Sequence, residues 1–314
     1  MVKYILKRFL HALLSLFIIV TLIFCLLRLM PIEGYLGASV DKMSEEVKAA
    51  KLAAKGLDKP LHVQLFTFYR NLLRGNLGKS WIYRENVEIT KIIKPKIAVS
   101  IKLGVIAMAL SLCLGIPLGI LMTRHKGKSI DKLGNAFIVF IESAPSAVYF
   151  LFIQMYLTKG TGIPILYDRD NKISWILPIF SLALPSIAGY AMWLRRYMVD
   201  RMNQDYVKLA MAKGVSYKQI MSKHVFRNAI VPMVQTLPSS ILYTLTGSLY
   251  IESIYSIPGM GGLLIEVIQR QDNTMVQALV LIYAAIGILG LFLGDLLMGI
   301  VDPRIRLTGK EESR

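Results

Sequence analysis

Long apolar stretches alternate with shorter polar and basic stretches along the 314 residues of the chain. A helix needs about 20 mostly apolar residues to cross a bilayer, and six stretches come close to this length or exceed it. They cover residues 10–27, 98–122, 136–157, 175–194, 232–251 and 277–300. The pattern predicts an all-α membrane protein with about six transmembrane helices. Gly104, Gly115, Pro117 and Gly119 in the second stretch allow close contact with another helix or a bend.

Basic residues give the chain a formal net charge of +17. Nucleic-acid binding would place them on a soluble domain, whereas membrane topology places them in short cytoplasmic loops. They gather before the first span, at 124–132, at 195–227 and after the last span, and the loop 158–174 is close to neutral. The distribution favours a multi-pass protein of the cytoplasmic membrane with both termini in the cytoplasm, in contact with lipid and not with nucleic acid.

The same pattern predicts four segments. Residues 1–31 form the first transmembrane helix, 32–97 an extracytoplasmic segment, 98–302 the membrane core and 303–314 a cytoplasmic tail. Within the extracytoplasmic segment, one helix is expected from Ser44 towards Gly56. A second is expected with Asp58 as its cap, Pro60 near its first turn and Gly75 beyond its end. The segment 32–97 is therefore predicted to be helical.

A polar and basic stretch, 205–224, separates the fourth and fifth spans. Asp205 is expected to cap a first short helix, and Gly214 to end it in a left-handed conformation. Ser216 with Gln219 three residues later is typical of a capping box that opens a second helix. The stretch is thus predicted to be a short helix–turn–helix.

The first of these helices is predicted to carry one mostly apolar face, because Tyr206, Leu209, Ala210 and Lys213 recur at helical spacing. A short helical pair between two spans has little chain of its own to cover such a face. A groove on another protein is one way to bury it. A basic loop lying on anionic lipid headgroups is the alternative.

Two Gly-Lys-Ser triplets, at 78–80 and 127–129, match only the end of the phosphate-binding loop motif. The first Gly of that motif is replaced by Leu73 in one copy and by Met122 in the other. Cys25 and Cys113 lie in apolar stretches, and no His pair has zinc spacing. The chain is expected to bind no ATP, no metal and no other cofactor, so an ATP-driven process would need a separate subunit.

Three acids lie within or near the apolar stretches: Glu142, Glu252 and Asp295. A charge at the bilayer centre costs ~2.5–3.5 kcal/mol on insertion scales, so such groups usually face a polar cavity or a partner. Glu142, Ser143, Pro145 and Glu252 are candidate pore-lining residues, since Pro and small residues can open backbone carbonyls to a pathway. A hydrogen bond between helices is the alternative for Glu142. Asp295 is expected to serve packing or a buried pair, with a pore role as the alternative.

Residues 210–214 read Ala-Met-Ala-Lys-Gly and are followed by His224, by Arg-Asn-Ala at 227–229 and by Pro232. This stretch resembles the cytoplasmic EAA loop of ABC importer permeases, in the variant found in the oligopeptide permease B type. Lys208 stands where other importers have Glu. The stretches 56–61, 75–80, 252–261 and 302–306 resemble further segments of the same family.

The resemblance covers nearly the whole chain and implies the type I ABC importer permease fold. It implies a pore-forming subunit without catalysis of its own, paired with a second, dissimilar permease subunit. Two cytoplasmic ATPase subunits, which carry ATP and Mg, would each hold one coupling segment, and an extracytoplasmic peptide-binding protein would deliver oligopeptides. The residues implied for coupling are Asp205, Tyr206, Leu209, Ala210, Ala212, Lys213, Gly214 and Ser216.

Other functions remain open on the same residues. Relatives on this scaffold import dipeptides, nickel chelates, glutathione or short sugars. A secondary transporter would show inverted repeats or interrupted helices in corresponding halves, and no such repeat is visible. A membrane enzyme would need clustered His, Asp or Glu, and the four His residues are scattered.

Overall fold

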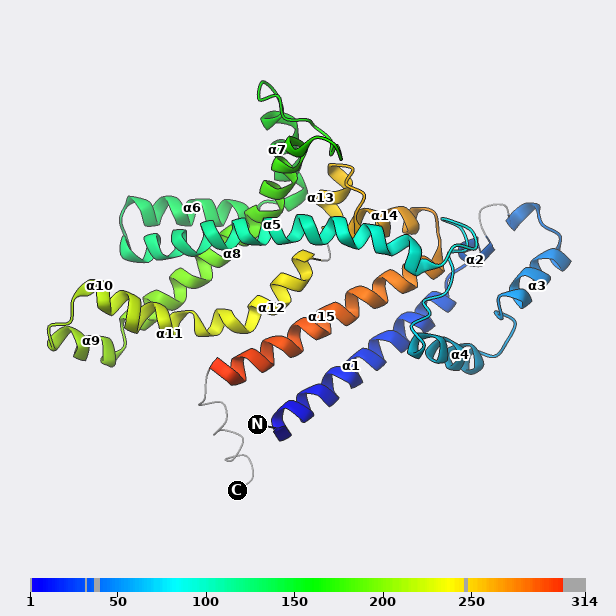
Figure 1. Cartoon of the computed structure of the whole chain (residues 1–314), viewed down its shortest axis with the longest axis horizontal. Coiled ribbons are helices and arrows are strands. Elements are labelled where there is room, and N and C mark those ends of the chain that lie inside the picture. Colours follow the sequence, from blue (N-terminus) through cyan, green and yellow to red (C-terminus); the bar gives the residue numbers. More distant parts are fainter. Residues whose placement is uncertain (1, 32, 37–39, 246–247, 302–314) are drawn as a thin grey trace. The chain divides into compact units, whose positions relative to one another are not determined.

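The computed structural model describes residues 2–31, 33–36, 40–245 and 248–301 (Figure 1). Every regular element in this part of the chain is a helix, which confirms the predicted all-α fold class. Four helices are long and apolar enough to cross a membrane. They are α1 (Val2–Arg28), α5 (Ile89–Arg124), α8 (Ile176–Met202) and α15 (Asn273–Val301).

The prediction of about six spans exceeds what the described residues hold, which is four, or five if a bent pair counts as one. That pair is α6 (Ser129–Ser143) with α7 (Ser146–Leu157), bent by 107°. The predicted fifth span is divided between two helices: α12 (Val231–Leu245), with 15 residues, and α13 (Leu249–Ile254). The division has a local cause, because the side chain of Ser248 accepts from the backbone N–H of Ile251 and so caps a new helix.

The chain forms two compact units. Unit 1 contains residues 1–9, 102–245 and 289–314, and unit 2 contains residues 10–101 and 246–288. These units follow packing, whereas the four predicted segments follow position relative to the membrane. The segment boundaries stay a prediction, and the tail motif 302–306 lies outside the described residues.

Two glycines bring α5 and α8 together in unit 1. A Cβ at Gly115 would meet the carbonyl oxygen of Ile187 at 2.9 Å, and one at Gly119 would meet that of Ala191 at 2.9 Å. Glycines four residues apart let two helix backbones approach closely in a membrane. The predicted close contact is therefore confirmed. In the same unit, Arg8 pairs with Asp295 at 3.0 Å. The pair expected for this acid was a buried one, whereas the Arg8 side chain is 47% exposed.

Unit 2 begins its polar part with short helices: α2 (Glu33–Leu36), a 3₁₀ turn (Val40–Lys42), α3 (Glu45–Ala54) and α4 (Leu61–Leu73). Ser44 caps α3 as predicted. Gly75 follows α4 with φ +71°, also as predicted. The predicted cap Asp58 is wrong: Pro60 holds the cap position of α4, and Asp58 lies two residues further out, beyond reach of the first free N–H groups.

A helical hairpin, α13 with α14 (Met260–Gln269), closes around one carboxylate. Glu252, 1% exposed, accepts from the backbone N–H groups of Gly261 (2.6 Å) and Gly262 (3.0 Å) and from the Ser100 hydroxyl (2.6 Å). The Ser100 hydroxyl in turn accepts from the N–H of Met260 (2.8 Å). The free N–H groups that begin α14 are thus satisfied. Glu252 is therefore buried and bonded within unit 2, and its candidate pore-lining role stays a prediction.

A second buried carboxylate joins the loop after Gly78 to the start of α15. Asp272, 0% exposed, accepts from the Ser80 hydroxyl (2.7 Å) and from the backbone N–H groups of Ile82 and Tyr83 (3.0 Å each). Burial alone would raise the pKa of Asp272, but these bonds and one from Thr274 outweigh burial and hold the pKa below its usual value. Two buried carboxylates, Glu252 and Asp272, thus join separate segments of unit 2 by hydrogen bonds.

Candidate coupling site

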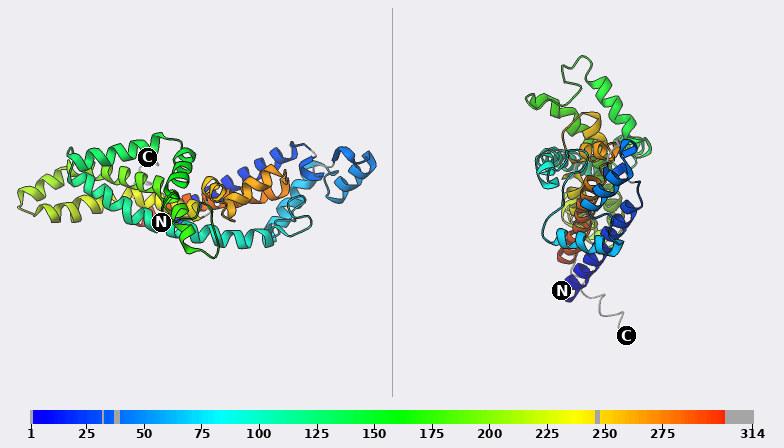
Figure 2. Two further views of the ribbon diagram at one scale, coloured as in Figure 1. Left: turned by 90° about the horizontal axis from the view of Figure 1, so that it is seen from above. Right: turned by 90° about the vertical axis from the view of Figure 1, so that its right-hand side faces the viewer.

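The stretch predicted as a helix–turn–helix lies beyond the end of α8 in unit 1 (Figures 1 and 2). It contains α9 (Asp205–Ala212), α10 (Tyr217–Gln219), a π-helical segment (Ile220–Phe226) and α11 (Arg227–Ala229). The helix–turn–helix is confirmed, with the second helix widened into π geometry. π-Helical turns are rare and often occur at functional sites.

Gly214 ends α9 with φ +76°, the left-handed conformation expected of it. Its N–H donates to the carbonyl of Met211 (2.9 Å), and the N–H of Val215 donates to that of Ala210 (3.1 Å). These two bonds form a Schellman motif, which strongly favours glycine because a side chain is strained there. No atom lies within 4 Å of a Cβ at this position, so the requirement for glycine comes from the backbone and not from crowding.

The two predicted caps have different outcomes. The side chain of Ser216 accepts from the N–H of Gln219 (3.4 Å) and caps α10, as expected. Asp205 is not the cap of α9: Gln204 holds that position, without a bond from its side chain, and Asp205 is the first helical residue. The Asp205 carboxylate instead pairs with exposed Lys208 at 2.9 Å, because the side chains three residues apart share one side of the helix.

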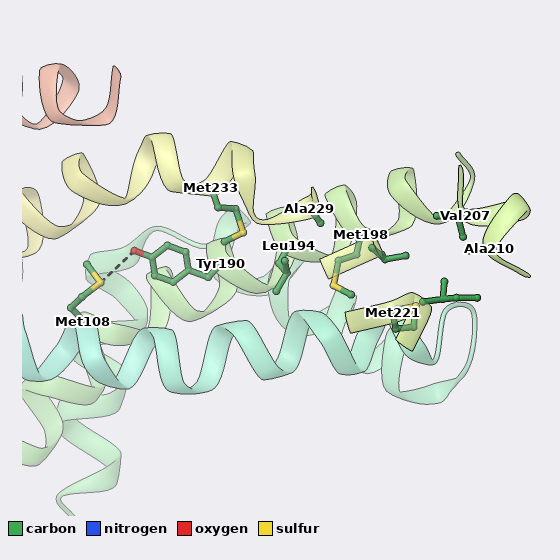
Figure 3. Packing of buried hydrophobic residues seen from close by; sticks show 11 residues of the cluster. Met108, Tyr190, Leu194, Met198, Val207, Ala210, Met221, Ala229 and Met233 are labelled. Atoms are coloured by element: carbon green, nitrogen blue, oxygen red, sulfur yellow. Dashed lines mark hydrogen bonds between the residues drawn. The ribbon is translucent and has the colours of Figure 1, made fainter. Parts of the chain in front are cut away.

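The side of α9 that packs on its own chain is small. Val207 and Ala210 are buried, 0% and 7% exposed. Figure 3 shows them among the side chains of α8 and the π-helical segment, including Met198 and Met221. Apolar burial of these two residues attaches α9 to unit 1, and the Asn228 amide adds a hydrogen bond to the Tyr206 hydroxyl (3.3 Å).

The rest of the predicted stripe remains uncovered. Tyr206 is 37% exposed and Leu209 is 57% exposed, and Lys213 is exposed beside them. Ala212 is exposed as well. We call Tyr206, Leu209 and Lys213 the open face of α9. The sequence predicted one apolar face, and the structure divides it into a buried edge at Ala210 and this open face.

An ion pair missed by the sequence analysis fixes the end of α8 from which the site projects. Asp131, 3% exposed, binds the Arg195 guanidinium through two bonds, Nε to Oδ1 (2.5 Å) and Nη2 to Oδ2 (2.8 Å). The carboxylate also accepts from the N–H of Gly127 (2.8 Å) and from Asn135 (3.2 Å). A two-bond Arg–carboxylate pair fixes orientation as well as distance. A single acid within a run of basic residues at 124–132 was the available signal.

Glu142, Ser143 and Pro145 lie at the bend between α6 and α7. α6 ends at Ser143, Ala144 is extended and α7 begins after Pro145. Glu142, Ser143 and Pro145 are exposed in the single chain. The predicted third span, 136–157, is thus broken between two helices that are bent by 107°. The pore-lining role of these three residues stays a prediction.

A hollow of about 460 Å³ between α8 and α12 was also missed. Hydroxyl groups four residues apart line it from both helices: Ser186 and Tyr190 on α8, Thr236 and Ser240 on α12. The aromatic rings of Trp193 and Tyr197 complete one wall. Polar groups on apolar helices usually face a partner or a cavity, and their regular spacing could have indicated this surface.

Comparison with known proteins agrees with the geometry. Residues 115–307 match the family described as binding-protein-dependent transport system inner membrane component. Residues 1–87 match the N-terminal family of the same systems. A multi-pass helical chain with this basic loop is a membrane transport subunit, and the chain belongs to the binding-protein-dependent transport system inner membrane component family.

Several relatives are similar over their full length. The dipeptide transport system permease protein DppB of Lactococcus lactis is 35% identical over 307 residues, which cover 98% of this chain and 100% of that protein. The oligopeptide transport system permease protein OppB of Haemophilus influenzae is 32% identical over 312 residues, 98% of this chain and 100% of that protein. The dipeptide permease DppB of Bacillus subtilis is 30% identical over 312 residues, with coverage of 99% and 100%.

Proposed function

We propose that the chain is one pore-forming subunit of an ATP-driven importer that moves oligopeptides across the cytoplasmic membrane. The observation that carries the proposal is the open face of α9: exposed Tyr206, Leu209 and Lys213 on a helix that Val207 and Ala210 hold firmly. Such a helix suits a groove on a cytoplasmic ATPase. The chain itself hydrolyses nothing, and ATP and Mg are bound by two partner ATPase subunits.

The attachment of α9 supports transmission of movement. Its turn is fixed by Gly214, its inner edge packs on α8, and α8 is joined to α6 by the Asp131–Arg195 pair and to α5 at Gly115 and Gly119. A displacement of α9 would therefore move helices of the membrane core as one body. Closure of the ATPase dimer would push α9 and open the pathway outward.

The remaining partners follow from the family. A second, dissimilar permease subunit completes the pathway, and an extracytoplasmic peptide-binding protein docks on the segment 32–97. Both termini lie in the cytoplasm of a multi-pass protein of the cell membrane, as the basic loops favour. The Glu142 carboxylate at the α6–α7 bend faces the pathway and favours cationic or amino-terminal groups of the peptide.

The substrate class rests on the relatives, which are named for dipeptides and for oligopeptides. Oligopeptides are our choice because the loop motif at 210–214 is of the oligopeptide permease B type. Dipeptides, nickel chelates, glutathione and short sugars are the other cargoes that this scaffold carries in relatives. A secondary transporter is a less favoured class.

The test is uptake by proteoliposomes that contain the chain with its second permease, both ATPases and the binding protein. We expect uphill uptake of labelled oligopeptides that requires ATP, is lost when an ATPase is omitted, and exceeds uptake of dipeptides. Uphill transport by the chain alone would reject the proposal. ATP-dependent uptake of dipeptides or another cargo in preference would retain the mechanism and replace the substrate.

A further inference from the structure

A hollow of about 310 Å³ within unit 2 has no ligand assigned to it so far. It is formed by the last turn of α1, the loops flanking α4, α4 itself and the first two turns of α15. Four cationic side chains line it and no carboxylate does: Arg28, Lys55, Lys59 and Lys79. Cations gathered around one hollow repel one another, so the arrangement favours an anion.

Two of these four cations, Arg28 and Lys55, form hydrogen bonds to neighbouring parts of the protein. The Arg28 guanidinium donates to Gln64 (2.8 Å) and to the Tyr35 hydroxyl (3.1 Å), and Lys55 donates to the Tyr35 carbonyl (2.5 Å) and lies over the Trp81 ring. Burial lowers the pKa of Lys55, and the attraction of Glu85 does not restore it. An anion in the hollow would relieve that cost.

The other two cations, Lys59 and Lys79, and the amide of Gln277 are available to bind a ligand. Lys59 and Lys79 are exposed, and their ammonium groups make no ion pair or hydrogen bond within the described residues. Gln277, 7% exposed, forms part of the wall, and its side-chain nitrogen is buried without a hydrogen-bond partner among the described residues. Buried amide donors nearly always have an acceptor in native proteins. The wall thus holds an unused donor beside unused positive charge.

Apolar side chains also line the hollow: Phe68, Leu72, Ala278 and Leu281. The hollow also lies where the α1 span ends and the α15 span begins. We propose that it binds a phosphate group whose source is the headgroup of an anionic phospholipid, with the acyl chains along the apolar wall. Phosphate oxygens accept charge-assisted hydrogen bonds from Arg and Lys donors, and free phosphate would use the same donors.

The experiment uses the assembled transporter in detergent, with native mass spectrometry to count retained lipid. Wild type is compared with the double variant Lys59→Ala, Lys79→Ala, after addition of phosphatidylglycerol, phosphatidylcholine or inorganic phosphate. The control is Lys42→Ala, Lys91→Ala, which removes the same charge from exposed positions outside the hollow. All four lysines are exposed, so both variants are expected to fold.

We expect wild type and the control variant to retain one phosphatidylglycerol. The Lys59→Ala, Lys79→Ala variant, called the hollow variant, should bind it about tenfold or more weakly, since each basic residue near a surface adds to anionic lipid binding. Gln277→Leu should weaken retention as well while the chain stays folded. Binding of inorganic phosphate with no lipid preference, lost in the hollow variant, would support the phosphate site and make free phosphate its source. Equal retention in wild type and hollow variant, or equal loss in hollow variant and control, would overturn it.

Discussion

The coupling site of unit 1 and the α13–α14 hairpin of unit 2 are built from similar parts with opposite results. Each is a pair of short helices joined by a tight turn after a longer apolar helix. In the hairpin, Glu252 and Ser100 satisfy the N–H groups that begin α14, and Ile251, Tyr255 and Leu263 are at most 1% exposed. The hairpin is complete within its own chain.

The coupling site, in contrast, has backbone groups without a side-chain cap and apolar side chains that its own chain does not cover. No side chain caps α9, two small side chains attach it, and Tyr206 and Leu209 face outward. The contrast teaches that exposed apolar residues on α9 are not a failure of packing, because the same chain packs a comparable hairpin fully. α9 is arranged to be completed by another molecule, in agreement with the proposed function.

The largest expected effect is in the hairpin. Glu252→Ala removes the acceptor of Gly261, Gly262 and Ser100, and a buried donor left without a partner costs about 1–3 kcal/mol. We expect a loss of roughly 3–5 kcal/mol in stability, comparable to breaking a buried pair. The measurement is thermal unfolding of the detergent-solubilised protein, together with its yield.

Glu266→Ala is the matched control, since this acid of α14 pairs with Arg270 at 2.8 Å on the surface. Surface pairs contribute about 0–1 kcal/mol, so this variant should unfold almost as wild type does. Glu252→Gln keeps one acceptor oxygen, so its unfolding temperature should lie between those of Glu252→Ala and Glu266→Ala. If Glu252→Ala unfolded at the same temperature as Glu266→Ala, the hairpin would not depend on its carboxylate.

The next effect concerns the base from which α9 projects. Gly119→Ala places a methyl group 2.9 Å from the backbone oxygen of Ala191, and a crowded core contact of this kind costs about 1–3 kcal/mol. Gly189→Ala is the same substitution on α8 with no atom within 4 Å, and Ala in a helix is favoured over Gly by roughly 0.5–1 kcal/mol. Thermal unfolding should therefore shift in opposite directions. Equal shifts would show that α5 and α8 do not meet at Gly119.

Much of the fold follows from local sequence. Apolar stretches gave the long helices, Ser44 and Ser216 mark helix starts, and Gly75 and Gly214 mark helix ends, because these features depend on residues close in sequence. Local pattern was less reliable where two signals compete. Asp58 and Asp205 both favour a cap, yet the cap positions are held by Pro60, two residues later, and by Gln204, one residue earlier.

Contacts between distant residues could not be read from the sequence in this way. The Ser100–Glu252 bond joins residues 152 positions apart, and the Asp131–Arg195 pair joins residues 64 apart. Periodicity cannot say which polar residue finds which partner. For this reason the sequence did not show that Glu252 bonds to Ser100 and to the start of α14. The open face of α9 was predicted correctly only in part, since the sequence did not show that Ala210 turns inward.

Gly214→Val tests the turn of the coupling site. A left-handed conformation costs a residue with a Cβ about 1–2 kcal/mol, and the variant should relieve this by moving α9. We expect peptide uptake to fall at least tenfold while the complex still hydrolyses ATP. Gly160→Val is the control, because Gly160 has φ +77° against +76° for Gly214 and equally open surroundings in another loop. Equal uptake by both variants would show that the turn of α9 is not part of coupling.

Leu209→Ala is expected to have the smallest effect on stability. Compared with Val207→Ala, it separates the residue of α9 that binds the ATPase from the residue that stabilises the fold. Leu209 is 57% exposed, so its truncation should change stability by no more than about 0.5 kcal/mol. Val207→Ala, two residues away, empties a fully buried position and should cost about 2 kcal/mol. Binding to the ATPase subunits should show the reverse order, with Leu209→Ala weakened about tenfold and the folded fraction of Val207→Ala binding as wild type does. Unfolding and co-purification measured on the same samples separate the two effects, and unchanged ATPase binding by Leu209→Ala would mean that the open face of α9 is covered by something else.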